Sequence, residues 1–244
     1  MPVILRNPHS VLAALKVRPQ DVLEVVVPSE ERSSRFSSAQ QEGSEAVSES
    51  DVWGQVRLRA QKLGIPLRSS KSAQAAQGSR GRSSRMGNGP KDQSLRLGGS
   101  EATVRERAPV ASEELFSGAT SRAEGRGLWL ALDCLQDPQN VGAIFRAAAF
   151  FGVQGILLTQ ERSASLTGTV YDVASGGLEF VPFVVQANLQ RGFEVAKKAG
   201  LWVLGTSEHA QEDVAAVACD RPWLLVLGNE EKGIRRLTEE SCDV

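Results

Sequence analysis

Hydrophobic positions in the first part of the chain follow a helical period and then a strand pattern. In the segment PHSVLAALKV, which follows Asn7, the apolar residues Val11, Leu12 and Leu15 recur at helical spacing. The run VLEVVV is β-branched and closed by a proline, which indicates a strand. The pattern predicts a small α/β domain over residues 1–68, with a helix over 8–17, a strand over 22–27, a helix over 52–63 and a short strand over 65–67.

From residue 128 onward, short apolar runs alternate with segments of helical period. This alternation is typical of βαβ crossovers, which build a largely parallel sheet with helices on both faces. In such α/β sheets, ligands bind at the carboxyl ends of the strands. The expected strands are LWLALD, GILLT, FVPFVV, LWVLGT and WLLVLG, and the expected helices cover 141–151, 166–174 and 189–199, with a last one beginning near Gly233.

Two segments, residues 32–51 and 69–126, are rich in Ser, Gly, Gln, Ala and charge and lack periodic apolar residues. Such a composition does not bury enough apolar surface to offset the entropy of ordering the chain. We therefore predict a disordered insert at 32–51 and a disordered linker at 69–126. Between Arg68 and Arg107 there are 9 basic and 3 acidic residues, a net charge of +6, so the linker is either a basic tether for phosphates or a solvated spacer.

Charge is balanced over the whole chain but not between its parts. The 28 Lys and Arg against 29 Asp and Glu give a net charge of -1. Residues 127–244 hold 9 basic and 15 acidic residues, which gives -6 and leaves 19 basic and 14 acidic residues, or +5, for residues 1–126. This division argues against a uniformly cationic protein and indicates different partners for the two parts.

The sequence carries few residues suited to a metal site or a disulfide framework. Its three cysteines, Cys134, Cys219 and Cys242, form no CxxC pair, and its two histidines are His9 and His209. No apolar run reaches the roughly 20 residues of a membrane span, and the N-terminus lacks the apolar core of a secretory signal. We expect a soluble protein without a metal or a membrane, in the cytoplasm by default and otherwise in a mitochondrion or plastid.

Unusual residues follow three of the expected strands. The first segment, DCLQDPQNVGAIFR, places Asn140 where a helix N-cap is expected, so that free backbone N–H groups face the carboxyl edge of the sheet. Arg146 lies in the otherwise apolar helix FRAAAFFG. Spacing alone leaves two interpretations open for Arg146: a functional cation, or a structural arginine that pairs with a nearby carboxylate.

The other two segments are LGTSE, with Gly205 and Thr206, and GNEEKG, which carries Glu230 on a tight turn between a strand and a helix. Glycines in such a turn let the backbone approach a ligand. Neither GxGxxG nor GxxxxGK[ST] is present, so the dinucleotide and P-loop signatures are excluded, and an ordinary βα connection is the alternative. His209 could act as a general base, but the sequence places no Ser or Cys nucleophile on a recognisable elbow motif. We therefore interpret His209 as a surface loop residue.

Together, four segments resemble one known family. LALDCLQDPQNVGAIFRAAAFFGVQGILLT, TGTVYDVASGGLEFVPF, LWVLGTSE and LLVLGNEEKGIRRLTEESCD are similar in order and spacing to the SpoU/TrmH group of SPOUT methyltransferases. Members of this group transfer a methyl group from S-adenosylmethionine to a ribose 2′-hydroxyl of tRNA or rRNA. The resemblance implies a catalytic domain over residues 127–244, with a trefoil-knot fold and a homodimer. NPHSVLAAL also resembles the opening of the small RNA-binding domain, of the ribosomal-protein L-thirty-e type, that precedes the catalytic domain in the rRNA branch.

The resemblance assigns the candidate residues to motifs and roles. The family's first motif matches at Asp133, Asn140 and Arg146, its second at Gly228, Asn229, Glu230 and Gly233, and the segment between them at Ser175, Gly176, Gly177 and Glu179. The implied catalytic residues are Arg146, Asn140 and Glu230. The implied S-adenosylmethionine-binding residues are Gly205, Thr206, Gly228, Asn229 and Gly233. Arg146 would stabilise negative charge at the hydroxyl or the adjacent phosphate, because a guanidinium is effectively always protonated.

Two features depart from the family pattern. The strand that usually closes the N-terminal domain is replaced after Leu67 by low-complexity sequence, and no third motif of the type S-L-N-V-S appears before Val244. We therefore expect a C-terminally truncated member with an incomplete knot. The leading hypothesis is an S-adenosylmethionine-dependent RNA 2′-O-ribose methyltransferase, with 23S-type rRNA guanosine as the expected target and tRNA as the second choice. The alternatives are an inactive RNA-binding relic of such an enzyme and an unrelated flavodoxin-like binding protein.

Overall fold

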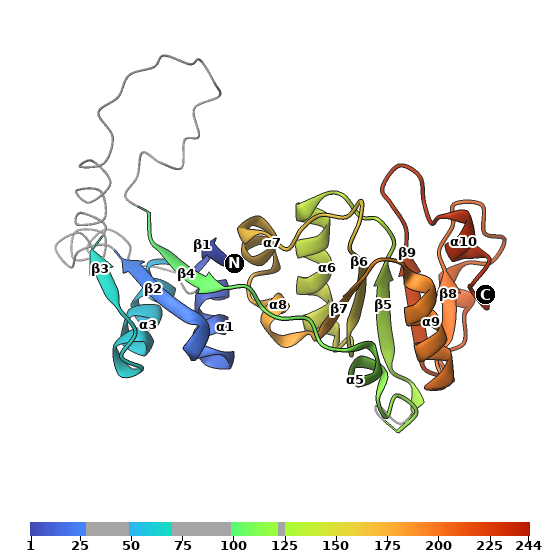
Figure 1. The fold of residues 1–244 in the computed structure, drawn as a ribbon, viewed down its shortest axis with the longest axis horizontal. Coiled ribbons are helices and arrows are strands. Elements are labelled where there is room, and N and C mark those ends of the chain that lie inside the picture. The colour runs from blue at the N-terminus through green and yellow to red at the C-terminus, as the bar shows by residue number, and fades with distance from the viewer. Residues whose placement is uncertain (28–48, 70–98, 122–124) are drawn as a thin grey trace, which may run out of the picture. The chain divides into compact units, whose positions relative to one another are not determined.

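The computed structural model describes residues 1–27, 49–69, 99–121 and 125–244, which group into two compact units, residues 1–106 and 107–244 (Figure 1). The predicted insert lies outside the described residues except for 49–51, and so do positions 70–98 and 122–124 of the predicted linker. No helix within the described ranges is long and apolar enough to cross a membrane.

A four-stranded sheet with the order β1-β4-β2-β3 forms the N-terminal unit. The helix and strand predicted at 8–17 and 22–27 are confirmed as α1 and β2. Asn7 caps α1 by accepting a hydrogen bond from the backbone N–H of His9, which explains where the helix begins. The elements of this unit are β1 (Pro2–Leu5), α1 (Pro8–Val17), η1 (Pro19–Asp21), β2 (Val22–Val27), α3 (Glu49–Lys62), β3 (Leu67–Ser69) and β4 (Glu101–Arg105).

Strand β4 shows that the prediction of a disordered linker over 69–126 was wrong for its last part. β4 lies between β1 and β2 and pairs antiparallel with both, with Ala102 and Val104 fully buried. Only two side chains of β4 enter the core, so its own sequence carries a weak signal, and its order depends on strands far away in the chain. The short helix α5 (Ser112–Phe116) lies in the same predicted linker, and α3 already begins inside the predicted insert.

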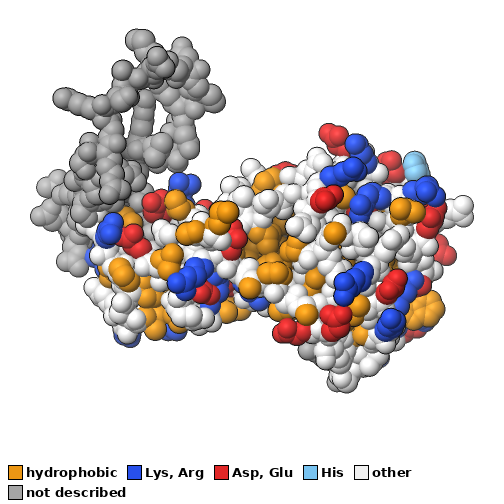
Figure 2. All heavy atoms as spheres, in the orientation of Figure 1, with side chains coloured by type: hydrophobic (Ala, Val, Ile, Leu, Met, Phe, Trp, Pro, Cys, Tyr) orange, Lys and Arg blue, Asp and Glu red, His pale blue; other side chains and the backbone are white. Residues whose placement is uncertain are grey.

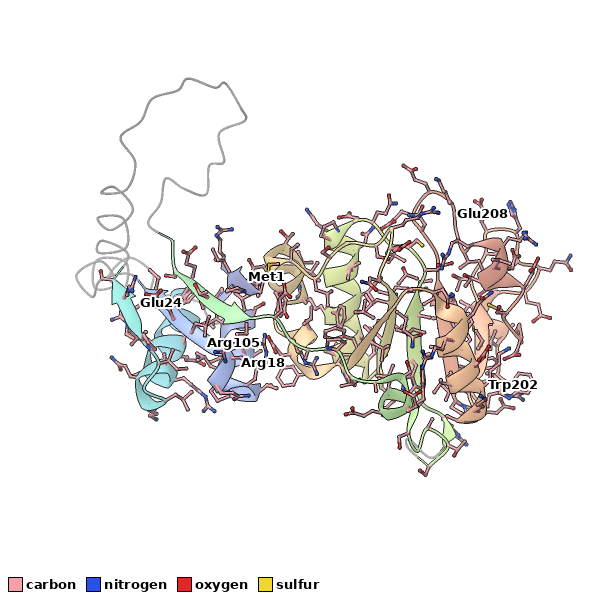
Figure 3. All side chains as sticks on the ribbon, viewed as in Figure 1. Met1, Arg18, Glu24, Arg105, Trp202 and Glu208 are labelled. Carbon is pink, nitrogen blue, oxygen red and sulfur yellow. The ribbon has the colours of Figure 1, made fainter. Side chains whose placement is uncertain are left out.

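One buried arginine ties β4 to the rest of this unit. The guanidinium of Arg18, which is 6% exposed, donates to the carbonyl oxygen of Arg105 (Figure 3). It also lies 3.6 Å from the carboxylate of Asp21. Asp21 is also 3.7 Å from the Arg105 guanidinium. The buried cation therefore has partners, as a charge removed from water requires.

Five parallel strands form the sheet of the C-terminal unit, which confirms the predicted parallel α/β architecture. The strand order is β7-β6-β5-β9-β8, so the chain moves outward from β5 in one direction and then returns to the other side of it. The order reverses between β5 and β9. In open parallel sheets, this switch point is where the loops diverge and ligands bind. The strands are β5 (Leu128–Leu132), β6 (Ile156–Thr159), β7 (Phe183–Gln186), β8 (Trp202–Gly205) and β9 (Trp223–Leu227).

Helices cover both faces of this sheet (Figure 1). Trp129 and Ala131 of β5 pack in one core with α5 and α9 (Leu189–Lys198). Because side chains alternate along a strand, Leu130 and Leu132 face the opposite layer. That layer consists of α6 (Pro138–Phe151), α7 (Gly168–Ala174) and α8 (Gly177–Phe180), and the short η4 (Val214–Ala216) and α10 (Arg236–Glu239) complete the unit.

One strand boundary differs from the prediction. The run FVPFVV was expected to be a strand from its first residue, but Phe180 belongs to α8, and β7 begins at Phe183. The left-handed backbone at Ser175 and Gly176 turns the chain directly from α7 into α8. The apolar run alone therefore concealed the end of a helix.

Candidate active site

The switch point brings the first and third polar segments together. Leu132 of β5 is paired with Leu227 of β9, and the backbone N–H of Asp133 donates to the Leu227 carbonyl oxygen over 2.8 Å. The loops 133–137 and 228–235 therefore leave the sheet side by side at its carboxyl edge.

Glu230 connects these two loops. Its carboxylate accepts hydrogen bonds from the backbone N–H groups of Gln136, at 3.3 Å, and Asp137, at 3.2 Å, and from the side-chain amide of Asn140, at 3.1 Å. Desolvation alone would raise the pKa of Glu230, but these bonds and that from its own backbone outweigh it and lower the pKa. The ionised carboxylate therefore holds the turn after β9 against the start of α6.

The N-cap of α6 is Asp137, so the expectation that Asn140 would cap this helix was wrong. The Asp137 carboxylate accepts from the backbone N–H of Gln139 over 2.8 Å, and Pro138 occupies the first helical position. Proline at that position loses no hydrogen bond and already has a helical φ, which favours an earlier start. Asn140 consequently lies in the first turn, where its side chain is free to bind Glu230.

Asn229 and the two glycines shape the GNEEKG turn. Asn229 and Gly233 exchange backbone hydrogen bonds of 2.9 Å in both directions. The Asn229 side chain accepts from the backbone N–H groups of Glu231 and Lys232 and donates to the carbonyl oxygen of Cys134. A Cβ at position 228 would lie 2.2 Å from the carbonyl carbon of Gly233, so close packing within the turn itself requires glycine there.

A buried ion pair fixes the far end of the same loop. Asp133 is fully buried, and its Oδ1 accepts a hydrogen bond from Nε of Arg235 over 2.7 Å and lies 2.7 Å from Nη2 of the same guanidinium. Its Oδ2 accepts from the Arg235 backbone N–H over 2.9 Å. Both oxygens of a carboxylate that has lost its water therefore have a partner, Oδ1 the guanidinium and Oδ2 the backbone N–H. The sequence placed Asp133 in a motif but did not identify Arg235 as its partner, because charged residues a hundred positions apart give no pairing signal.

Gly205 is the last residue of the neighbouring strand β8, and Thr206 follows it. Thr206 donates its hydroxyl to the carbonyl oxygen of Val226 over 2.8 Å, which places it beside the end of β9. A Cβ on Gly205 would lie 3.0 Å from Sγ of Cys242 and 3.1 Å from Ile234. The glycines at 205 and 228 are thus both explained by contacts within the chain.

Within a single chain, Arg146 does not join the hydrogen-bonded site formed by Asn140, Glu230 and the two loops. It is exposed on α6, roughly 9 Å along the helix axis from Asn140 at 1.5 Å per residue. Among the described residues its side chain has no ion pair or hydrogen bond, so the structural interpretation, a pair with a carboxylate, finds no support. The backbone of Gly177 lies directly against it, since a Cβ on Gly177 would be 2.9 Å from the Cα of Arg146.

The remaining candidate chemistry is sparse. His209 is exposed, with its Nε2 3.7 Å from the carboxylate of the exposed Glu208, so it is a surface residue. No cluster of His, Cys, Asp and Glu suited to a metal ion occurs in the described part of the chain. Both signs of charge lie side by side on the visible face of residues 107–244 (Figure 2).

Fold and site together define an α/β protein with a candidate ligand site at the switch point of a parallel sheet. The model of the SpoU rRNA Methylase family matches residues 127–244, which include every loop of that site. Residues 127–244 therefore form a domain of the SpoU rRNA Methylase family.

Curated relatives share substantial sequence with this chain. It is 41% identical over 145 residues to the 23S rRNA (guanosine-2'-O-)-methyltransferase RlmB of Pseudomonas aeruginosa, over 59% of this chain and 58% of that protein. It is 42% identical over 132 residues to RlmB of Nitrosomonas europaea, over 54% of this chain and 49% of that protein. The chain thus spans about half the length of the curated relatives it matches.

Solved structures share the fold at lower identity. The SpoU methyltransferase AviRb from Streptomyces viridochromogenes, in complex with AdoMet, gives a TM-score of 0.64 at 18% identity, over 99% of this chain and 78% of that one. An AdoMet-bound rRNA methyltransferase from Sinorhizobium meliloti gives 0.64 at 17% identity, over 99% and 76%. The likeness shows the α/β fold with its parallel sheet.

Proposed function

We propose that this protein is an S-adenosylmethionine-dependent methyltransferase that modifies the ribose 2′-hydroxyl of a guanosine in rRNA, in the cytoplasm. The observation that carries the proposal is the linkage of Asn140 and Glu230 across the switch point of a SpoU-family domain. The names of the P. aeruginosa and N. europaea relatives favour 23S rRNA guanosine as the target. The positive charge of residues 1–126 favours that part as the one that holds RNA.

The loop chemistry of the site fits the proposed cofactor. S-adenosylmethionine supplies an electrophilic methyl group on a sulfonium cation. Glu230 and Glu231 give the carboxyl edge negative charge, which suits a cation, and the turn offers backbone amides and carbonyls to neutral groups. We assign cofactor binding to the chain around Gly205, Thr206, Gly228, Asn229 and Gly233.

The chain's own residues divide the remaining tasks. A ribose hydroxyl is a poor nucleophile, so it must be held in line and its developing negative charge must be stabilised. Arg146 orients the adjacent phosphate and stabilises that charge, since its guanidinium stays protonated and presents a planar fork. Asn140 and Glu230 keep the start of α6 and the turn after β9 in fixed relation.

A second copy of the chain completes the site in this proposal. Arg146 lies in an exposed stripe of α6 that is otherwise apolar, formed by Ala143, Ala147, Phe150 and Phe151. The side chain of Phe150 is 83% exposed and that of Phe151 is 77% exposed. Two adjacent exposed aromatic rings are unusual on a helix that faces water. Pairing two copies through this stripe buries both rings and brings Arg146 close to the partner's switch point.

The catalytic proposal is tested by transfer of labelled methyl groups from S-adenosylmethionine to 23S rRNA. Arg146→Ala should lower the transfer that the unaltered chain shows by about a hundredfold or more while keeping its cofactor affinity, because the guanidinium acts on the hydroxyl and phosphate. Arg191→Ala, which removes another exposed arginine from α9, is the matched control and should stay active. Folded, fully active Arg146→Ala would remove Arg146 from the catalytic residues.

The pairing proposal is tested by sedimentation of the full chain. Phe150→Glu combined with Phe151→Glu should convert a dimer to a monomer, because burying two unpaired carboxylates in the interface is energetically unfavourable. Phe180→Glu, which changes another exposed ring outside the stripe, should leave the dimer intact. A monomeric unaltered chain would contradict the composite site.

A further inference from the structure

The loop that follows β6 is fixed on both sides of a single exposed arginine, Arg162. The backbone N–H of Gln160 donates to the carbonyl oxygen of Gln186, and that of Ala164 to the carbonyl oxygen of Leu135 over 2.8 Å. Ser163 shares a hydrogen bond with Thr159 through their hydroxyls. Gln160, Ser163 and Ala164 are therefore anchored to the sheet or to the loop after β5.

Arg162 itself adopts a left-handed backbone, with φ 57°. This conformation is energetically unfavourable for a residue with a Cβ, and residues with such strained backbone cluster at functional sites. Among the described residues, the Arg162 side chain makes no hydrogen bond or ion pair that would offset this unfavourable backbone energy. Cys134, in the adjoining loop, also has a positive φ of 61° and donates its backbone N–H to Thr159 over 3.0 Å, so both strained residues belong to one locked assembly.

The position and chemistry of Arg162 point to its ligand. It lies at the carboxyl edge of β6, next to the strand whose following loop leads to Asn140. That edge also carries the exposed carboxylates of Asp137 and Glu161, which repel a polyanion, so RNA needs a cation such as Arg162 in order to approach there. A guanidinium fork held at this edge matches a phosphate oxygen pair.

We propose that Arg162 contacts a backbone phosphate of the substrate RNA, and that the strained loop after β6 holds the Arg162 side chain in the position for this contact. The inference rests on the proposed function, since RNA must approach this edge of the sheet. It assigns Arg162 a role distinct from Arg146, because Arg162 serves affinity for RNA and takes no part in stabilising the reacting hydroxyl.

Two substitutions separate contact from strain. Arg162→Ala removes the guanidinium and keeps the strained backbone, whereas Arg162→Gly removes both. With the full chain and a fluorescein-labelled, guanosine-containing RNA hairpin, both variants should bind roughly tenfold more weakly at low salt, and the slope of log affinity against log salt should fall by about 1. Arg162→Gly should unfold at a higher urea concentration than Arg162→Ala. Lys198→Ala, at the opposite edge of the sheet, is the control and should retain affinity and slope.

Calorimetry with S-adenosylmethionine identifies the source of any effect. Both Arg162 variants should bind this cofactor as the unaltered chain does. Unchanged RNA affinity and salt slope in folded Arg162→Gly would overturn the inference while leaving the methyltransferase proposal intact, and so would a loss confined to cofactor binding. An unaltered chain that neither binds the hairpin nor methylates rRNA would refute the proposed function, and the inference with it.

Discussion

At the scale of single residues, Glu230 shows how one exposed carboxylate can organise a site. It accepts three hydrogen bonds from the start of α6, and these bonds favour the ionised form of the carboxylate over the protonated one. Because the pKa of Glu230 is lowered in the folded chain, the stabilisation is complete above the ordinary value of 4.5 and is lost as pH falls through the lowered value.

This dependence can be measured at the amide groups that donate to Glu230. The backbone amide signals of Gln136 and Asp137 in an NMR titration should shift together, with a midpoint below 4.5. In Asn140→Ala the midpoint should move upward, because the Asn140 side chain is one of the groups that lower the pKa. Asn188→Ala, at the start of α9, is the control. An unchanged midpoint in Asn140→Ala would mean that the amide bond to Glu230 is absent in solution.

The sequence identified several site residues but not how they are arranged. Asn140 and Glu230 were selected from motifs, and in the structure Nδ2 of Asn140 lies 3.1 Å from Oε1 of Glu230. The N-cap was misplaced because Asp137-Pro138 and Asn140 are both acceptable helix starts, and only the backbone distinguishes them. The strain at Arg162 left no trace in the sequence, since arginine is not a residue that signals a left-handed turn.

Cysteine reactivity follows from burial. Cys134 is 6% exposed, and desolvation raises its thiol pKa, while burial raises that of Cys242 to about 11. Cys219 is exposed. A disulfide reagent at mildly alkaline pH should therefore modify one thiol quickly in the folded chain, and Cys219→Ser should abolish that fast phase. Two fast thiols in the native protein would contradict the described burial.

At the scale of elements, the turn after β9 depends on two glycines for different reasons. Gly228 has backbone atoms of Gly233 and Ile234 within 2.6 Å of its would-be Cβ, whereas Gly233 has open space but a φ of 66°. Steric contact with backbone is costlier than a left-handed φ, because backbone cannot rotate away.

The two alanine substitutions should therefore differ in size. Gly228→Ala should lower the free energy of unfolding by roughly 3 kcal/mol, and Gly233→Ala by about 1 kcal/mol. Urea denaturation of each variant measures both values. Gly54→Ala, in α3 with nothing within 4 Å of the added methyl group, is the control and should not destabilise the chain. Equal losses at 228 and 233 would show that the turn relaxes around the added methyl group.

Elements that pair over long distances were the ones the sequence concealed. The strands β5, β6, β8 and β9 were predicted near their observed positions because each is a continuous apolar run with at least two buried side chains. β4 and α5 were missed because each presents only two or three buried side chains after a long polar segment. Their order comes from partners elsewhere in the chain, which local pattern does not reveal.

At the scale of the whole molecule, the boundary of the C-terminal unit lies before the family match. The unit begins at Arg107, whereas the family model and the predicted catalytic domain begin at 127. The intervening residues contribute to the core: Leu115 and Phe116 are 2% and 0% exposed, and the Trp129 indole donates to the Leu115 carbonyl oxygen over 3.2 Å. Arg107 donates to the carbonyl oxygens of Leu178 and Val181.

Residues 107–126 should therefore be part of the folding unit. Burying Leu115 and Phe116 contributes about 2 kcal/mol each, a large share of the roughly 5–15 kcal/mol that stabilises a domain. A fragment covering 107–244 should unfold cooperatively in urea, whereas one covering 127–244 should unfold at much lower urea or not fold, with α9 and Trp129 losing their cover. Within 107–244, Leu115→Ala combined with Phe116→Ala should reproduce the loss, and Glu113→Ala combined with Glu114→Ala, on the same helix, should not. Equal stability of the two fragments would show that α5 is an accessory to the domain instead of part of its core.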